Sequence, residues 1–264
     1  MDSESILLQE TRNGVRFLQM NRPEAKNALS NDLTRALIRG FEAAASDDDV
    51  RVVALTGGGG AFCSGADLSK RKPGDPAPDS VEVTADLVVQ LVTGIRAGCE
   101  KPVIAGIDGI AIGAGLSLAM CADMRMASSR ALFHPGYARV GTSPDAGLSW
   151  TLPATLGHEQ AMRFFLQPKM HDAGAALALG LVGEVVDADG FDDAFVAFCE
   201  EIAEVAPLAA TQTKRLVTRL EVPEGIDAHL RDELVLAARG LKSKDGREAV
   251  RAIREKRKPK FTGR

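Results

Sequence analysis

Short apolar runs alternate with helical patterns along the first half of the chain, and this alternation restricts the fold more than any other feature. An apolar run at residues 15–20 is followed by a helical pattern that ends near residue 45 and then by a second apolar run at residues 50–56. A strand, a helix and a strand in that order indicate a βαβ unit with a crossover connection. The alternation continues to residue 127, so the sequence predicts an α/β fold with a parallel or mixed sheet.

Two local signals identify the elements near the start of the chain. Asn13-Gly14 separates the apolar runs at residues 6–10 and 15–20, and an Asn-Gly turn between β-prone runs is typical of a hairpin. Ser30 precedes apolar residues at helical spacing that extend to about residue 45, and Ser is a favoured N-cap. We therefore expect a β-hairpin followed by a helix that Ser30 caps.

Helical patterns dominate the second half of the chain. Further helices are predicted near residues 80–100, 113–121, 146–156, 191–205, 208–220, 227–241 and 246–260, and further strands at 103–107, 124–127 and 181–186. A Pro/Gly-rich stretch at residues 70–78 predicts a surface loop.

Composition excludes several classes of function. The chain has 264 residues, 45% of them hydrophobic, and a formal net charge of −4, which indicates a soluble globular protein rather than one whose main partner is nucleic acid or an anionic membrane. The four cysteines are far apart and form no CxxC pair, so neither a zinc site nor a disulfide framework is expected. The first residues lack the pattern of a signal peptide, and no apolar run reaches the roughly 20 residues of a membrane-spanning helix. We expect a cytoplasmic protein.

Three glycine-containing or small-residue motifs carry a resemblance to a known family. They are residues 21–29 (NRPEAKNAL), 61–68 (AFCSGADL) and 109–118 (GIAIGAGLSL), and Gly157 follows them. Each motif alone is typical of tight turns and close packing. In this order and at this spacing, over nearly the whole chain, they resemble the crotonase superfamily, also called the enoyl-CoA hydratase/isomerase family. Gly113-Ala114-Gly115 is not a dinucleotide fingerprint, because the third glycine and the following acidic residue are missing.

The resemblance implies a fold, a substrate class and an assembly. It implies a ClpP-like spiral of ββα turns with the acyl-CoA site in residues 1–195, and a helical region in residues 196–264 that serves trimerisation and covers the CoA. The substrate would be an acyl-CoA thioester, the partner a second copy of the chain in a homotrimer or a dimer of trimers, and no cofactor besides the CoA of the substrate is expected.

The resemblance also implies an oxyanion hole. By motif, its two backbone N–H donors are those of Ala66 and Ala114. Removal of a proton beside a thioester places negative charge on the thioester oxygen, and one pre-aimed donor contributes about 3–4 kcal/mol to its stabilisation.

The acid expected from the resemblance differs from that of a hydratase. Hydratases of this family use two glutamates, and the corresponding positions here are Ser117 and Tyr137, neither of which is a base at neutral pH. Asp145 coincides instead with the acid of the dienoyl-CoA and epoxyphenylacetyl-CoA isomerases of the superfamily. One carboxylate suits a 1,3-proton shift, so we predict a double-bond isomerase with Asp145 as its base.

A helix cap is the alternative role of Asp145. Ser143-Pro144-Asp145 precedes the helix predicted at 146–156, and Ser at N-cap, Pro at N1 and Asp in the first turn are all favoured there. An enoyl-CoA hydratase and a non-catalytic acyl-CoA-binding protein therefore remain as alternatives to the isomerase.

Further residues are expected to bind the CoA or to line the pocket. Arg22, Lys26 and Lys256 are candidates for its phosphates, and the alternative for them is a solvated charged face, which suits Lys256 equally well. Ala28, Asp67, Leu68, Gly113, Ser117 and Tyr137 complete the expected binding set.

Four other positions are interpreted as structural, as part of the pocket or as excluding a reaction. His134 and Asp123 are interpreted as structural, and Asp108 as a pocket group. Gln90 stands where the dehalogenase of the superfamily has its histidine base, so dehalogenation is not expected.

Overall fold

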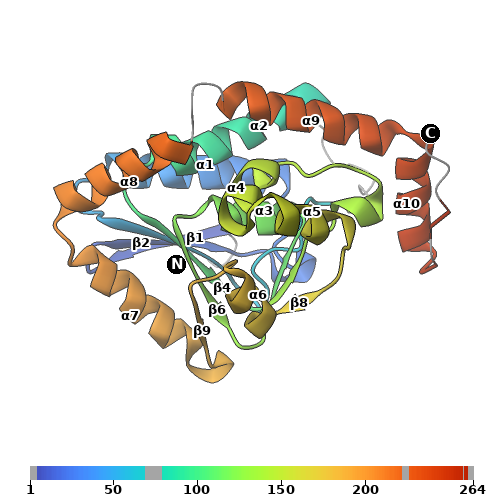
Figure 1. Cartoon of the computed structure of the whole chain (residues 1–264). Helices are drawn as coiled ribbons and strands as arrows, with labels where there is room; N and C mark the ends of the chain where they lie inside the picture. Colours follow the sequence, from blue (N-terminus) through green and yellow to red (C-terminus); the bar gives the residue numbers. More distant parts are fainter. Residues whose placement is uncertain (1–4, 69–78, 222–225, 258, 261–264) are drawn as a thin grey trace.

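A six-stranded mixed sheet forms the centre of the molecule in a computed structural model that describes residues 5–68, 79–221, 226–257 and 259–260 (Figure 1). β1 pairs antiparallel with β2, and every other neighbouring pair is parallel. In spatial order the strands are β1 (Leu7–Arg12), β2 (Val15–Met20), β3 (Val52–Gly57), β4 (Val103–Ile107), β6 (Met124–Ser128) and β9 (Glu184–Val186). The predicted α/β class with a mixed sheet is confirmed.

A second, three-stranded sheet lies beside the first in the described part of the chain. It consists of β5 (Ile110–Ile112), β7 (Leu132–His134) and β8 (His171–Asp172), in which β5 and β7 are parallel and β7 and β8 antiparallel. Gly109, at φ +79°, turns the chain from β4 into β5, and a side-chain carbon on it would lie 2.1 Å from the carbonyl oxygen of Gly60. This contact is possible only for glycine, and it brings residues 109–112 beside residues 60–63.

The first hairpin and the first helix form as predicted. Asn13 and Gly14, at φ 49° and 77°, connect β1 to β2, as the positive φ values of a type I′ turn require. Ser30 caps α1 (Asn31–Ser46), because its Oγ accepts a hydrogen bond from the Leu33 N–H at 3.2 Å.

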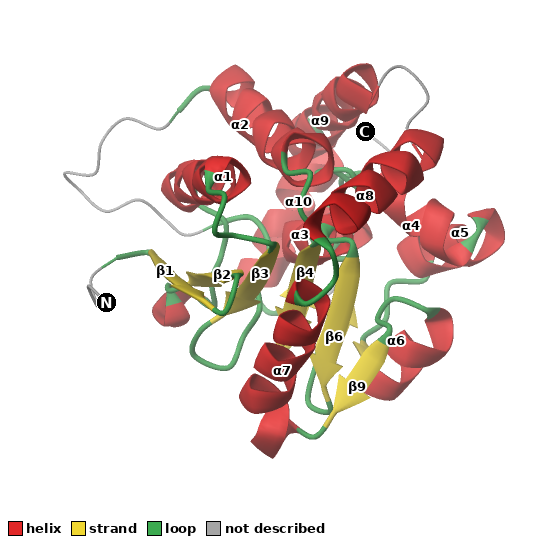
Figure 2. Cartoon of the chain, turned by 90° about the vertical axis from the view of Figure 1, so that its left-hand side faces the viewer, coloured by secondary structure: helices red, strands yellow, loops and turns green. Residues whose placement is uncertain are grey.

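Helices cover both faces of the main sheet. α7 (Phe191–Ala203) packs on one face, where the Phe195 ring fills the space left by Gly106 on β4, and Figure 2 shows this helix in front of the strands. α1 packs on the other face, followed outward by α2 (Val81–Thr93), which continues as a π-helix at Gly94–Gly98. The sheet is therefore buried on both sides, as parallel sheets usually are.

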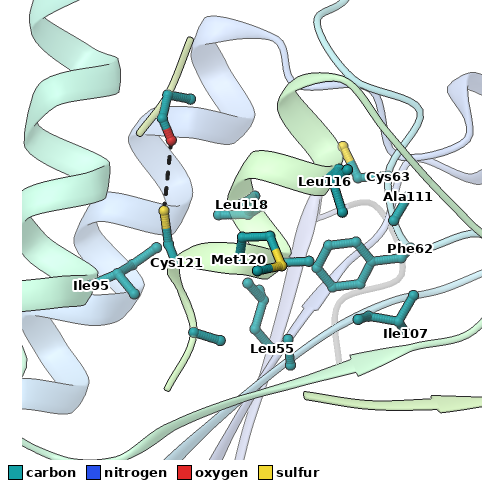
Figure 3. Close-up of a cluster of buried hydrophobic side chains, with 14 of the residues drawn as sticks. Leu55, Phe62, Cys63, Ile95, Ile107, Ala111, Leu116, Leu118, Met120 and Cys121 are labelled. Atoms are coloured by element: carbon teal, nitrogen blue, oxygen red, sulfur yellow. Dashed lines mark hydrogen bonds between the residues drawn. The ribbon is translucent and has the colours of Figure 1, made fainter. Parts of the chain in front are cut away.

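α3 (Ala114–Cys121) lies in the middle of the larger hydrophobic core. Every residue from Gly115 to Cys121 is buried. Figure 3 shows Leu116 and Met120 of this helix among Phe62 and Leu55, while Cys121 Sγ lies 3.7 Å from the carbonyl oxygen of Ala146. A polar side chain on α3 is therefore surrounded by protein on all sides.

α4 begins later than the sequence predicts. The helix comprises Leu148–Leu156 and its N-cap is Gly147, so the expected start at residue 146 with Ser143 as cap is wrong. Ala146 and Gly147 have φ values of 50° and 79°, and two successive left-handed residues cannot be part of an α-helix. Asp145 consequently lies in the loop before the helix.

The remaining helices pack mainly on other helices and helical turns, and α6 packs beside strands of both sheets. They are α5 (His158–Leu166), α6 (Ala173–Leu179), α8 (Pro207–Glu221), α9 (Ile226–Lys242) and α10 (Lys244–Arg254). α9 packs on α2, and α10 packs against a 3₁₀ turn at Tyr137–Val140, where Gly246 and Gly141 approach closely. The helical C-terminal region is confirmed. None of the helices in the described ranges is long and apolar enough to cross a membrane.

α8 is attached to the core by a buried ammonium group. Lys214 Nζ donates hydrogen bonds to the carbonyl oxygens of Ile95 at 2.9 Å and Lys101 at 3.0 Å, and forms an ion pair with Asp123 at 2.8 Å. The side chain of Lys214 is only 5% exposed.

Candidate active site

The backbone segments that carry Ala66 and Ala114 come close together at the start of α3. Gly65, at φ +103°, passes so close to β5 that a side-chain carbon on it would lie 2.8 Å from the Ile112 carbonyl oxygen and 3.7 Å from the Ala114 nitrogen. Ala114 is the first residue of α3, so its N–H has no acceptor within the helix. Within the described part of the chain, no backbone acceptor is found for the N–H of Ala66 either. The backbone segments of the two predicted oxyanion donors thus lie close together, and their role as donors stays a prediction.

Close packing of glycines keeps these donors near each other. A side-chain carbon on Gly115 would lie 2.3 Å from the carbonyl oxygen of Cys63, and that same oxygen accepts a hydrogen bond from the Ile112 N–H at 3.0 Å. The loop that carries Ala66 therefore runs directly against β5 and the first turn of α3. A larger residue at position 115 would separate them.

The first motif holds the Ala66 loop from its other side. The Leu29 N–H donates to the Gly65 carbonyl oxygen at 2.8 Å, and the Asp67 N–H donates to the Leu29 carbonyl oxygen at 3.1 Å. The Ser64 N–H donates to the carbonyl oxygen of Lys26 at 3.0 Å. Residues 21–29 thus support the loop that carries Ala66.

Asn27 is a supporting residue that the sequence reasoning missed. It is fully buried, and its Nδ2 donates to the carbonyl oxygens of Gly58 at 2.9 Å and Ala61 at 2.7 Å. Its Oδ1 accepts the Arg22 N–H at 2.8 Å. The only signal was its residue type, because Asn tolerates the left-handed conformation (φ 55°) that this turn requires.

Ser117, Tyr137 and Asp145 converge at one point beside α3. The oxygen atoms of Ser117 and Tyr137 are 2.6 Å apart, and Tyr137 donates to Oδ1 of Asp145 at 2.7 Å. Ser117 Oγ also lies 3.1 Å from the backbone carbonyl oxygen of Asp145. The three residues come from a helix, a 3₁₀ turn and a loop, and the sequence reasoning had mapped all three to the site.

The direction of these hydrogen bonds follows from the protonation of Tyr137. Burial raises the pKa of the phenol well above its ordinary value, and the negative charge of Asp145 raises it further. The phenol therefore keeps its single proton and donates it to Oδ1 of Asp145, so Ser117 must donate to the phenol oxygen if both short contacts are hydrogen bonds. The result is a chain of donors that runs from Ser117 through Tyr137 to Asp145.

Asp145 has a different position from the helix cap that the sequence left open as an alternative. Its backbone carbonyl oxygen accepts the Leu148 N–H at 3.1 Å, while its carboxylate accepts the Tyr137 hydroxyl. The side chain thus faces the polar point beside α3. Its role as a base stays a prediction.

The expected CoA-binding residues occupy different environments. Arg22 forms an ion pair with Asp67 at 2.8 Å and donates to the Ala28 carbonyl oxygen at 2.6 Å, so it also stabilises the Ala66 loop. Lys26 is exposed with φ 49°, Ala28 is buried, and Leu68 and Lys256 are exposed. The predicted loop at residues 70–78 lies outside the described residues. That these residues bind CoA stays a prediction.

Three other polar residues make structural contacts. Arg130 forms a two-point ion pair with Asp108, Asp123 pairs with Lys214, and His134 is buried among backbone groups. Gln90 lies on the exposed side of α2.

Comparison with known proteins identifies the family. The family model described as enoyl-CoA hydratase/isomerase matches residues 10–264. The chain is 33% identical to 1,2-epoxyphenylacetyl-CoA isomerase from Escherichia coli, with 98% of this chain and 99% of the relative covered. It is 34% identical to (E)-benzylidenesuccinyl-CoA hydratase from Thauera aromatica, with 96% of this chain and 98% of the relative covered. The protein therefore belongs to the enoyl-CoA hydratase/isomerase family, the crotonase superfamily, and acts on acyl-CoA thioesters.

Solved structures agree with this assignment. An enoyl-CoA hydratase/isomerase from Pseudoalteromonas atlantica superposes with a TM-score of 0.86 at 34% identity, with 98% of this chain and all of that chain covered. An enoyl-CoA hydratase from Mycobacterium avium superposes with a TM-score of 0.88 at 30% identity, with 98% of this chain and 99% of that chain covered. The predicted crotonase fold is confirmed, and isomerase and hydratase names occur among the relatives at similar identity.

Proposed function

We propose that the protein is an enoyl-CoA isomerase that moves a double bond along an acyl chain by a 1,3-proton shift, with Asp145 as the single base. The observation that carries the proposal is the hydrogen bond of 2.7 Å from the Tyr137 hydroxyl to Oδ1 of Asp145. It holds a carboxylate at the point where Ser117 and Tyr137 converge, and these are the positions at which the hydratases that the chain resembles carry glutamates. The site thus has one carboxylate, from position 145, where those hydratases have two glutamates at the positions of Ser117 and Tyr137.

The reaction balances with that one carboxylate. Asp145 removes a proton from C2 of a 3-enoyl thioester, and the electrons move to the thioester oxygen, where the Ala66 and Ala114 N–H groups bind the enolate. The carboxylic acid then returns a proton to C4, so the double bond shifts from C3–C4 to C2–C3 and the base is regenerated. General acid–base catalysis of this kind contributes roughly 10²- to 10⁴-fold, and each oxyanion donor about 3–4 kcal/mol.

Hydration is the second candidate function, and the names of the relatives favour it. The family includes a 2,3-dehydroadipyl-CoA hydratase from Escherichia coli that is 31% identical to this chain. Addition of water needs groups that bind and deprotonate a water molecule. Here the raised pKa keeps the Tyr137 phenol protonated at neutral pH, so it cannot take a proton from water, and isomerisation is preferred for this reason.

Incubation with 3-enoyl-CoA and with 2-enoyl-CoA in D₂O tests the proposal, with wild type compared to Asp145→Asn. We expect the wild type to interconvert the two thioesters with deuterium at C2 or C4, and Asp145→Asn to be at least about 100-fold slower while it still binds the thioester. Addition of water without double-bond migration, unaffected by the substitution, would identify a hydratase. Binding without turnover in the wild type would identify a non-catalytic acyl-CoA-binding protein.

We also propose that the protein assembles as a homotrimer or a dimer of trimers through residues 196–264. Large apolar side chains on α8 support this proposal, since Leu208 is 69% and Val217 52% exposed. Measurement of the molar mass in solution by light scattering tests it, and a monomeric mass at micromolar concentration would contradict it.

A further inference from the structure

His134 makes hydrogen bonds to both segments from which the candidate site is built. It is the last residue of β7. Its backbone carbonyl oxygen accepts the Gly113 N–H at 3.0 Å, and its ring Nδ1 accepts the Gly136 N–H at 2.8 Å. Gly113 directly precedes the donor Ala114, and Gly136 directly precedes Tyr137. One residue therefore links the oxyanion hole to the group that hydrogen-bonds Asp145.

The two glycines that His134 holds also touch each other. A side-chain carbon on Gly136 would lie 3.1 Å from Cα and 3.2 Å from N of Gly113. Both glycines have positive φ values, 54° for Gly113 and 77° for Gly136. A change in the conformation of residue 136 would thus be transmitted to the start of α3, because no space separates the two backbones.

The bond to Gly136 requires one protonation state of the ring. Nδ1 can accept a hydrogen bond only when it carries no proton, so the proton of the neutral ring is on Nε2. A protonated ring would place an Nδ1–H against the Gly136 N–H, and two donors would face each other. His134 is only 3% exposed, so water cannot relieve this conflict.

The groups around His134 favour the neutral ring. Burial is the main cause that lowers its pKa below the ordinary value, and the positive charge of Arg139 on the 3₁₀ turn is the second, while a backbone hydrogen bond with Pro168 acts in the opposite direction. His171 on β8 acts in the same direction if it is charged. Near His171 lie Lys169, which lowers the pKa of that histidine, and Asp172, which raises it. Burial and the neighbouring positive charges outweigh the Pro168 bond, so the net direction of the His134 pKa is downward.

We propose that His134 is a positioning residue. In its neutral form it fixes the position of the Ala114 N–H relative to Tyr137, and its protonation in acid moves the two groups apart. The effect on activity rests on the proposed function, whereas the hydrogen bond does not. Because the pKa of His134 is lowered on folding, the unfolded chain takes up the proton first. The neutral ring makes its full contribution to the free energy of unfolding above the ordinary histidine pKa of about 6.5. That contribution is lost as the pH falls through the lower pKa of His134 in the folded protein.

The test combines NMR with kinetics on three variants. His134→Asn keeps an oxygen acceptor near the position of Nδ1 but does not titrate, His134→Leu removes the acceptor, and His171→Asn is a matched control that removes a buried histidine of the same sheet without contact to Gly136. In the unliganded wild type, ring ¹⁵N shifts should show the Nε2–H tautomer. The amide signals of Gly136 and Ala114 should move together as the pH falls below about 6.

The kinetic results expected are a different pH profile and a loss in kcat. His134→Leu should lower kcat by up to about 100-fold with little change in KM, because the reacting groups are displaced. His134→Asn should retain most of the activity at neutral pH, but the fall of kcat that protonation of His134 causes in acid should be missing. His171→Asn should still show that fall. An Nδ1–H tautomer, or amide signals of Gly136 and Ala114 that do not follow the ring, would overturn the proposal. Since these signals are measured without substrate, they decide it even if isomerase activity is absent.

Discussion

The hydroxyl of Tyr137 donates a hydrogen bond of 2.7 Å to Oδ1 of Asp145 across an interval of eight residues. Tyr137 is buried and Asp145 half-buried, so the bond joins a fixed ring to a carboxylate on a loop. A loop carboxylate loses side-chain entropy when it is held in one orientation. The bond to Tyr137 contributes to that orientation before any substrate is present.

Tyr137→Phe should therefore lower activity more than stability. The substitution keeps the ring and removes only the donor to Asp145, which should lower kcat for isomerisation by about 10-fold or more, with a loss of about 1 kcal/mol in the free energy of unfolding. Steady-state kinetics with 3-enoyl-CoA and urea unfolding measure the two effects. Ser117→Ala is the control, because it removes a group that reaches Asp145 mainly through Tyr137, and it should have a smaller effect. An unchanged kcat in Tyr137→Phe would show that the bond does not serve catalysis.

Gly65→Ala should disrupt the oxyanion hole. Both Gly65 and Gly60 have positive φ values, 103° and 74°, so alanine at either position is strained by roughly 1–2 kcal/mol. Only at Gly65 would the new carbon also meet backbone, 2.8 Å from the Ile112 carbonyl oxygen, whereas at Gly60 no described heavy atom lies within 4 Å. We expect kcat to fall about 10²- to 10³-fold in Gly65→Ala and to change little in Gly60→Ala. Equal kcat values in the two variants would argue against a donor at Ala66.

Lys214→Met should detach α8 from the core. It leaves Asp123 and the two carbonyl oxygens without their cation, and removal of one partner of a buried pair costs about 3–5 kcal/mol. Arg215→Met is the matched control on the same helix, because Arg215 and its partner Glu100 are each about half exposed and such a pair contributes at most about 1 kcal/mol. Thermal unfolding of both variants gives the comparison, and equal losses would show that burial of the ion pair is unimportant.

Glu248→Gln should loosen the end of the chain after α10. Glu248 accepts hydrogen bonds from Arg257, Arg251 and the Lys260 N–H, and these bonds hold its pKa far below the ordinary range. Ionised Glu248 therefore makes its full contribution to the free energy of unfolding above the ordinary glutamate pKa of about 4.3. That contribution is lost only as the pH falls through the much lower pKa of Glu248 in the folded protein. At neutral pH, trypsin should cleave after Arg257 faster in the variant than in the wild type. Identical digestion rates would contradict this role.

Local signals in the sequence were sufficient for the elements that depend on nearest neighbours. The Asn13-Gly14 hairpin and the Ser30 cap were predicted correctly, because each is determined by residues within one turn. The start of α4 was not, since Ala146 takes a left-handed conformation that its residue type disfavours and that only the surrounding structure can impose. The strands of the second sheet are only two or three residues long, and no periodicity can be read from so few residues.

In the candidate site, too, some features could be predicted from the sequence and others depend on the folded structure. The motifs were sufficient to bring Ala66 near Ala114 and to map Ser117, Tyr137 and Asp145 to one place. The contribution of Asn27 and the ring orientation of His134 were not predictable, because both depend on which backbone groups lie beside them after folding.

The convergence of Ser117, Tyr137 and Asp145 has a consequence for how such a fold can change its chemistry. A helix, a 3₁₀ turn and a loop each direct a side chain to the same small volume, while the Ala66 and Ala114 N–H groups are supported by other contacts. The structure therefore allows an acid to stand at any of these three backbone positions while the contacts that hold the Ala66 and Ala114 backbone stay the same.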